Sequence, residues 1–137
     1  MRILGLDIGS KRIGAAVSDE LGITARGLLT IERKSDEEVS RRLKDIISSE
    51  EIKEIVVGLP VNMNGSRGPQ AKAAADFADK IKKIYGLPVK LWDERMSTME
   101  AERILIAADI SRSGRKKKID KLAAQVILQS YLNARKS

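Results

Sequence analysis

The sequence predicts an α/β fold, with a mixed five-stranded sheet in the order 3-2-1-4-5 flanked by helices. Three apolar segments at the start of the chain are joined by short polar turns, which is typical of antiparallel strands. Two later apolar segments alternate with segments of helical periodicity, and right-handed crossovers make these two strands parallel to the first. We therefore expect the antiparallel strands on one side of the first strand and the parallel strands on its other side.

Local patterns give the bounds of the elements. Strands are expected at residues 2–8, 13–18, 23–31 and 54–59, with a fifth that ends near Asp93 or Glu94. Helices are expected after Ser35, from Pro69, after Ser97 and over residues 119–132. The two serines open capping boxes, and proline fits the first turn of a helix. No repeat or linker interrupts the pattern, so we expect a single domain over residues 1–137.

The composition narrows the chemistry that the chain can perform. It contains no cysteine and no histidine. Thiolate nucleophiles, disulfides, metals bound by Cys or His, and catalysis by a histidine base are therefore excluded. Carboxylates, lysine, arginine, backbone groups and hard cations such as Mg²⁺ or Mn²⁺ remain.

Charge and hydropathy indicate the kind of partner. The formal net charge of +7 favours a polyanion such as nucleic acid. No apolar run approaches the ~20 residues that a membrane-spanning helix needs, and the chain starts with a strand pattern in place of a signal peptide. We expect a cytoplasmic protein without a membrane partner. No helix pattern carries an extra apolar stripe, so a monomer or a weak homodimer is expected.

One acidic residue stands out because it interrupts an apolar strand. Asp7 lies near the end of the first strand, which is otherwise apolar enough to be covered on both faces. Burying an unpaired carboxylate costs several kcal/mol, so Asp7 needs a partner. That partner is a basic side chain such as Lys11 or Arg12, a set of backbone N–H groups, or a bound cation.

Further acids are expected beside Asp7. In the predicted sheet the carboxyl ends of the first, fourth and fifth strands share one edge, where α/β sheets place their ligands. Asp93 and Glu94 lie at the end of the fifth strand, and Asp120 lies at the start of the last helix. Three carboxylates at one place repel each other and need a cation, so the sequence predicts a metal site.

Each of these acids also has a plainer interpretation. Glu94 can form a surface ion pair with Arg95, and Asp120 can interact with the dipole of the last helix near its N-terminus. Asp93 and Glu94 point to opposite faces if the strand continues, and the sequence leaves the choice between them open, with a preference for Glu94.

Basic residues near the predicted site are candidates for nucleic-acid binding. Lys11 and Arg12 follow the first strand, where they either contact a phosphate or are simply solvated. The segment 111–118, "SRSGRKKK", is expected to be a mobile basic arm over the metal site, or else a solvated loop. Its candidate residues are Arg112, Arg115, Lys116, Lys117 and Lys118. The Gly- and Pro-rich segment 58–70 either offers backbone N–H groups to a phosphate or is a plain connection.

Four blocks of the sequence resemble one known family. They are "LGLDIGSKRIGAAVSD", "GLPVNMNGSRGPQA", "DERMST" and "KKKIDKLAAQVILQSYL". In order and spacing these blocks resemble the YqgF/RuvX family, whose members are described as pre-16S rRNA nucleases or as Holliday-junction resolvase-like proteins. The resemblance implies an RNase H-like fold and hydrolysis of a phosphodiester by metal-activated water, in processing the 5′ end of small-subunit rRNA.

The resemblance also implies site residues. By position, Asp7 matches the family's acid on the first strand, Glu94 the acid after the fifth strand, and Asp120 the acid of the last helix. Such a set supports two-metal hydrolysis. Asp7 is then expected to bridge two Mg²⁺ or Mn²⁺ ions, with Glu94 and Asp120 each completing the coordination of one ion.

Other functions stay open at this point. A Holliday-junction resolvase-like enzyme would cut structured DNA in place of pre-rRNA. A non-catalytic rRNA-binding assembly factor would need the basic residues but not three clustered acids. An actin-like ATPase fragment would use "DIGSKRIG" as a phosphate loop, although such enzymes need two domains.

Overall fold

The structure is a computed structural model that describes residues 1–96 and 115–135, with the side chains of 115–120 outside the described part. The elements before the second helix are β1 (Arg2–Ile8), β2 (Arg12–Ser18), β3 (Ala25–Glu32), α1 (Asp36–Ser49) and β4 (Ile52–Leu59). They are followed by α2 (Pro69–Tyr85), β5 (Val89–Asp93), the 3₁₀ turn η1 (Glu94–Met96) and α4 (Arg115–Arg135). None of the described helices is long and apolar enough to span a membrane.

The five strands form one sheet in the order β3-β2-β1-β4-β5, which confirms the predicted topology. β1 pairs antiparallel with β2, and β2 pairs antiparallel with β3. β4 pairs parallel with both β1 and β5. The carboxyl ends of β1, β4 and β5 therefore lie along one edge of the sheet, as expected for a ligand site.

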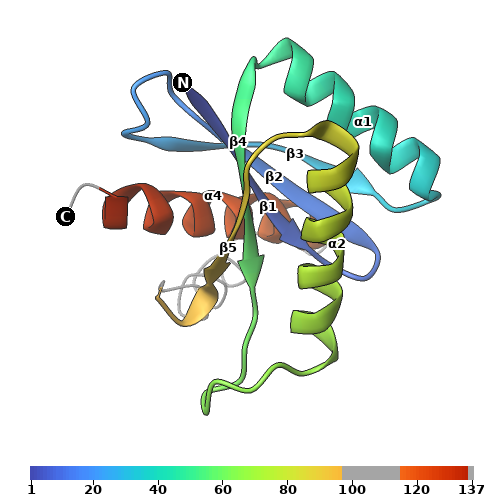
Figure 1. Cartoon of the computed structure of the whole chain (residues 1–137), viewed down its shortest axis with the longest axis vertical. Coiled ribbons are helices and arrows are strands. Elements are labelled where there is room, and N and C mark those ends of the chain that lie inside the picture. The colour runs from blue at the N-terminus through green and yellow to red at the C-terminus, as the bar shows by residue number, and fades with distance from the viewer. Residues whose placement is uncertain (97–114, 136–137) are drawn as a thin grey trace.

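Helices cover both faces of the sheet (Figure 1). α1 and α2 pack on one face, where their apolar residues join those of the strands in the larger core cluster. α4 crosses the other face and supplies most of the smaller cluster. Because strand side chains alternate, Leu4 and Leu6 of β1 join the first cluster, while Ile3 joins the second.

Glycines on three strands let α4 lie close to the sheet. A β-carbon added at Gly5 of β1 would come within 2.7 Å of the β-carbon of Leu128. One at Gly58 of β4 would meet Ile127, and one at Gly27 of β3 would meet Lys121. Any side chain at these positions would clash with α4, so α4 packs directly against the strand backbone at the three glycines.

Two of the four predicted helix starts are confirmed, one is wrong, and one lies outside the described residues. The side chain of Ser35 accepts a hydrogen bond from the Glu38 N–H at 3.1 Å, which confirms the first cap, and α2 begins at Pro69 as predicted. The helix expected after Ser97 falls in residues 97–114, which lie outside the described residues. The prediction that residues 115–118 form a loop is wrong, because α4 already begins at Arg115. Arginine and lysine are good helix formers, so a basic segment can extend the helix that follows it.

Candidate functional site

Asp7 lies at the carboxyl end of β1, on the face that α4 covers. Its side of the strand follows from alternation, since Gly5 two residues earlier lies beneath α4. The residue is buried, with 8% of its surface exposed. Its partner on β2 is Gly14. On the other side Leu6 pairs with Val57, so the next step along both strands places Gly58 beside Asp7. Asp7 therefore has a glycine beside it on each neighbouring strand.

Glu94 reaches the same face from the other side of β4. Its Oε2 atom is 3.0 Å from the position that a β-carbon on Gly58 would take. Gly58 is paired with Trp92 of β5, and Trp92 packs with α4 through Tyr131 and Ser130. Glu94 therefore follows Trp92 onto the α4 face, and the acids from β1 and from the end of β5 flank the same glycine. Carboxylate oxygens are the ligands that hard cations such as Mg²⁺ and Mn²⁺ prefer.

Asp93 has a different environment. Both of its carboxylate oxygens accept hydrogen bonds from Arg95, the shortest from Nη2 to Oδ2 at 2.7 Å. The side-chain hydrogen bonds from Arg95 lower the pKa of Asp93, and a backbone N–H bond and charge attraction from the same residue act in the same direction. The structure thus places Arg95 in an ion pair with Asp93, where the plainer sequence interpretation had paired it with Glu94.

Asp120 is located only by its backbone. It lies in α4, one helical turn before Ala124 and two before Ile127, both of which are buried against the sheet. Because α4 begins at Arg115, Asp120 belongs to the second turn, and the expectation that it lies in the first turn is wrong. Its side chain lies outside the described part, and among the described side chains no group of three acids is assembled.

Some of the basic candidate residues have described side chains, and others do not. Lys11 is exposed in the turn after β1. Arg12 forms an ion pair with Glu32 of β3, with Nε 3.1 Å from Oε1. Arg112 falls outside the described residues. Residues Arg115 to Lys118 form the first turn of α4, and their side chains lie outside the described part.

The segment between β4 and α2 contains an ordered turn. Within it the Asn62 N–H donates to the carbonyl of Ser66, the Gly65 N–H donates to the carbonyl of Asn62, and the Ser66 N–H donates to Asn64 Oδ1. These N–H groups are therefore already used inside the segment, which argues against offering them to a phosphate. Arg95 Nη1 donates to the carbonyl of Met63 at 3.1 Å. No sequence pattern predicts this contact, because nothing links Arg95 to a residue 32 positions earlier in the chain.

Solved structures of resolvases share the architecture. RuvC of T. thermophilus in complex with a Holliday junction substrate aligns with a TM-score of 0.59 and 18% identity, over 100% of this chain and 97% of that one. The Holliday junction resolvase of fowlpox virus aligns with a TM-score of 0.57 and 15% identity, over 98% and 99% of the two chains. With the sheet order, these matches define the class: the chain has the RNase H-like fold of resolvase-type nucleases.

Sequence comparison then gives the family. The model of the RuvX family, described as "Holliday junction resolvase", matches residues 1–134. A relative in Halothermothrix orenii is 56% identical over 133 residues, which are 97% of this chain and 95% of that one. A relative in Geobacillus kaustophilus is 56% identical over 138 residues, covering 99% and 100%. Both carry the name "Putative pre-16S rRNA nuclease". The chain belongs to the RuvX family, and the predicted resemblance is confirmed.

Proposed function

We propose that this protein is a metal-dependent endonuclease that hydrolyses phosphodiester bonds and processes the 5′ end of pre-16S rRNA. The observation that carries the proposal is the approach of Asp7 and Glu94 to one face of Gly58, from β1 and from the turn after β5. The names of relatives that are 56% identical over nearly the whole chain support pre-16S rRNA as the substrate. The net charge of +7 suits a nucleic-acid substrate.

The residues fit a divalent metal. Asp7 and Glu94 supply only oxygen donors, and the chain has no cysteine or histidine to favour a softer metal. Because Gly58 has no side chain, the Glu94 carboxylate can lie close to the backbone of β4. We assign Asp7, Glu94 and Asp120 as the ligands of Mg²⁺ or Mn²⁺. When bound, two such ions would supply an activated water and stabilise the leaving 3′ oxygen.

The chain's own residues do the remaining work. Asp7 is held in a paired strand and Glu94 sits above β4, so both carboxylates are fixed before the substrate arrives. Lys11 and the basic residues at the start of α4 attract and position the phosphate backbone. In the reaction water forms a bond to phosphorus and the bond from phosphorus to the 3′ oxygen breaks, leaving a 5′ phosphate.

Structured DNA is the second candidate substrate. Two observations favour it: the matching family is described as a Holliday junction resolvase, and the T. thermophilus RuvC structure contains a Holliday junction substrate. A non-catalytic role in ribosome assembly is the third candidate function, and it predicts nucleic-acid binding without turnover.

One cleavage experiment separates these functions. The purified protein and its Asp7→Asn variant are incubated with RNA that carries the pre-16S 5′ extension, and separately with a four-way DNA junction. Each substrate is tested in EDTA, Mg²⁺, Mn²⁺ and Ca²⁺. We expect RNA cleavage by the wild type in Mg²⁺ or Mn²⁺ only, because Ca²⁺ takes more ligands at longer distances than the reaction tolerates.

The controls make each failure informative. Mn²⁺ binding, followed by electron paramagnetic resonance, should weaken in Asp7→Asn while the thermal unfolding temperature stays equal or rises, since removing one of several clustered acids relieves repulsion. Cleavage in EDTA would contradict the metal requirement. Cutting of the junction but not of the RNA would assign the second function, and binding of RNA without cutting would assign the third.

A further inference from the structure

Arg95 joins two parts of the protein that are distant in the sequence. Its Nε and Nη2 atoms contact the Asp93 carboxylate at 2.7 to 3.2 Å, so the guanidinium is anchored at the end of β5. Its remaining nitrogen, Nη1, donates to the carbonyl of Met63 at 3.1 Å. A single planar group therefore ties the end of β5 to the segment that follows β4.

The segment that Arg95 holds is itself ordered. We call residues 61–67 the 61–67 loop. Asn62 Nδ2 donates to Ser66 Oγ at 2.9 Å, and Ser66 Oγ donates to Asn64 Oδ1 at 2.6 Å, in addition to the backbone bonds already described. Gly65 has a φ of 87°, which a glycine adopts without strain, and Arg95 Nη1 lies 3.7 Å from where its β-carbon would be. These bonds connect the loop to itself, and the bond from Arg95 to the Met63 carbonyl connects it to the end of β5.

This loop follows β4 at the end of the sheet where the candidate metal site lies. The chain leaves β4 after Leu59 and enters the loop. The residue before Leu59 is Gly58, and Glu94 lies over Gly58 on the face that α4 covers. Arg95 is the residue after Glu94, so loop and carboxylate are held from the same turn of η1. In Figure 1 the segment between β4 and α2 extends beyond the lower end of the sheet, where β4 and β5 both point.

The outer surface of the loop suits a nucleic-acid strand. Met63 is 87% exposed. Asn64 and Arg67 are also exposed. A methionine can pack on an unstacked base, an amide can bond to a base edge, and an arginine can bind phosphate. The Arg95 contact uses the Met63 carbonyl and so leaves the Met63 side chain outside.

We propose that Arg95 is a positioning residue, which holds the 61–67 loop against the end of β5 so that Met63 and Arg67 bind the substrate strand beside the acids. The proposal rests on the proposed nuclease function. Arg95 acts here through the loop and not by its own contact with a phosphate.

Binding measured without cleavage tests this role. Affinity for the single-stranded 5′ extension of the pre-16S substrate is measured in EDTA by fluorescence anisotropy. Arg95→Gln should weaken binding about fivefold to tenfold, the effect of one ordinary hydrogen bond. Arg95→Lys keeps the charge but lacks the planar fork, so its binding should be weakened nearly as much.

Asp93→Asn gives the sharpest distinction. It makes the protein more positive, and simple charge attraction would then tighten binding to RNA. If Arg95 positions the loop, the variant should bind more weakly, because Arg95 loses its anchor. Met63→Ala should weaken binding in the wild type but have little further effect in the Arg95→Gln background, since the two changes act on the same contact.

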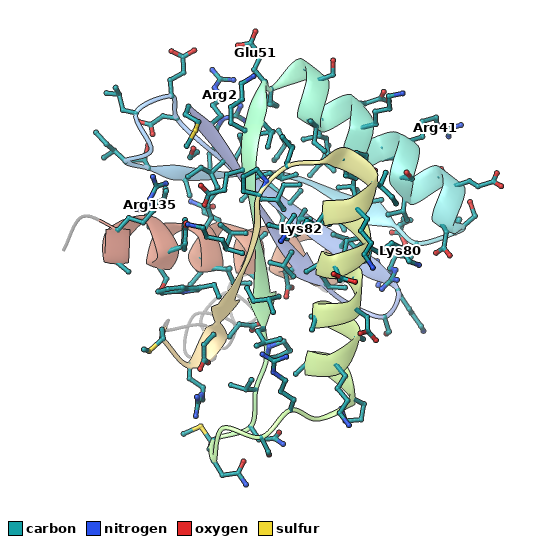
Figure 2. All side chains as sticks on the ribbon, viewed as in Figure 1. Arg2, Arg41, Glu51, Lys80, Lys82 and Arg135 are labelled. Atoms are coloured by element: carbon teal, nitrogen blue, oxygen red, sulfur yellow. The ribbon has the colours of Figure 1, made fainter. Side chains whose placement is uncertain are left out.

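The control variant is Arg41→Gln, which removes one charge on α1, away from the end where the loop lies (Figure 2). Its affinity should change by less than twofold. Hydrogen exchange of the Asn62 and Gly65 amides in the nucleic-acid-free protein should quicken in Arg95→Gln and stay unchanged in Arg41→Gln. Wild-type affinity in Arg95→Lys, or tighter binding in Asp93→Asn, would overturn the role of Arg95 and leave the nuclease function standing. A wild type that binds neither RNA nor DNA would overturn both.

Discussion

The carboxylate of Glu94 lies over Gly58, with Oε2 3.0 Å from the position that a β-carbon at residue 58 would take. Gly58 sits on β4, between Asp7 of β1 and the end of β5. The absence of a side chain at residue 58 therefore lets Glu94, from the turn after β5, lie on the same face of the sheet as Asp7 of β1. The geometry of the candidate metal site depends on this glycine as well as on the acids.

Replacing this glycine should damage activity more than stability. In Gly58→Ala the new methyl group would come within 2.6 Å of Ile127 Cδ1 and 3.0 Å of Glu94 Oε2. Both atoms are at the ends of side chains that can move, so we expect a loss of about 1–3 kcal/mol in the free energy of unfolding. The displaced carboxylate should lower kcat on the order of 100-fold. Urea unfolding and single-turnover cleavage measure the two effects.

Gly5→Ala is the matched control. Its methyl group would meet the β-carbon of Leu128 at 2.7 Å and the backbone oxygen of Ala124 at 3.3 Å, which cannot move without moving α4. This variant should be the less stable of the two. Equal stability, or a larger activity loss per kcal/mol in Gly5→Ala, would contradict the special place of Gly58 beneath Glu94.

The two adjacent acids should differ in their kinetic effects. Glu94→Gln removes an assigned metal ligand, so we expect kcat to fall on the order of 100-fold. Asp93→Asn disturbs the ion pair with Arg95, so KM should rise while kcat at saturating substrate stays within about twofold to threefold of the wild type. Steady-state cleavage in Mg²⁺ measures both. A reversed pattern would make Asp93 the ligand.

The basic residues before Asp120 should contribute to RNA binding through their charge. A variant in which five basic residues are all replaced by glutamine should show a flatter slope of log K against log salt. The five residues are Arg112, Arg115, Lys116, Lys117 and Lys118. Each lost phosphate contact on a single strand contributes ~0.7 to that slope, so five contacts would change it by roughly 3 to 4. Binding is measured in EDTA over a range of KCl concentrations, and Mn²⁺ binding serves as the control that the metal site is intact. An unchanged slope would make this segment a solvated surface.

A buried hydrogen bond far from the acids should matter for stability alone. Glu54 is 7% exposed, and its carboxylate accepts a hydrogen bond from the Tyr131 hydroxyl of α4. Tyr131→Phe should cost about 1.5–3 kcal/mol, since it removes a bond to a charged group. Tyr85→Phe is the control, because the Tyr85 hydroxyl bonds to the neutral carbonyl of Ser40 at 2.8 Å and should cost about 0.5–1.5 kcal/mol. Neither change should lower kcat, and equal costs in urea unfolding would contradict the comparison.

The Asp93–Arg95 pair should persist to low pH. Arg95 holds the pKa of Asp93 below its ordinary value of 3.8. A carboxyl whose pKa is lower in the folded state stabilises the fold above the unfolded-state pKa, and this contribution is lost only as pH falls through the folded value. The Asp93 carboxyl carbon, followed by NMR, should therefore titrate below 3.8 in the wild type and nearer to that value in Arg95→Gln. The same midpoint in both proteins would contradict the assigned cause.

The sheet could be predicted from the sequence because few topologies satisfy both short turns and helical crossovers. β1 occupies residues 2–8 as predicted, and Ser35 caps α1. The start of α4 could not be predicted, because Arg115 and the lysines after it suit a helix and an exposed arm equally well. The roles of Asp7, Glu94 and Asp120 as ligands stay predictions.

The choice between Asp93 and Glu94 shows why part of the site could not be predicted. Alternation along β5 says that neighbouring residues face opposite ways, but not which face a later helix covers. The face that the helix covers is decided by contacts of Trp92 and Gly58 with α4, and these contacts join residues far apart in the chain. The role of Arg95 likewise depends on the path of the loop around Met63. Such long-range contacts leave no local periodic signal.

The place of α4 in the chain has a consequence for the order of events during synthesis. α4 is the last described element, yet it covers the face formed by the strands that are made first. Until α4 has been synthesised, Ile3, Ala16 and Val56 have no helix over them. A nascent chain can thus pair its strands and pack α1 and α2 before the helix that carries Asp120 exists. If the enzyme acts as proposed, it stays unable to cut RNA until α4 has been synthesised and has packed on the sheet.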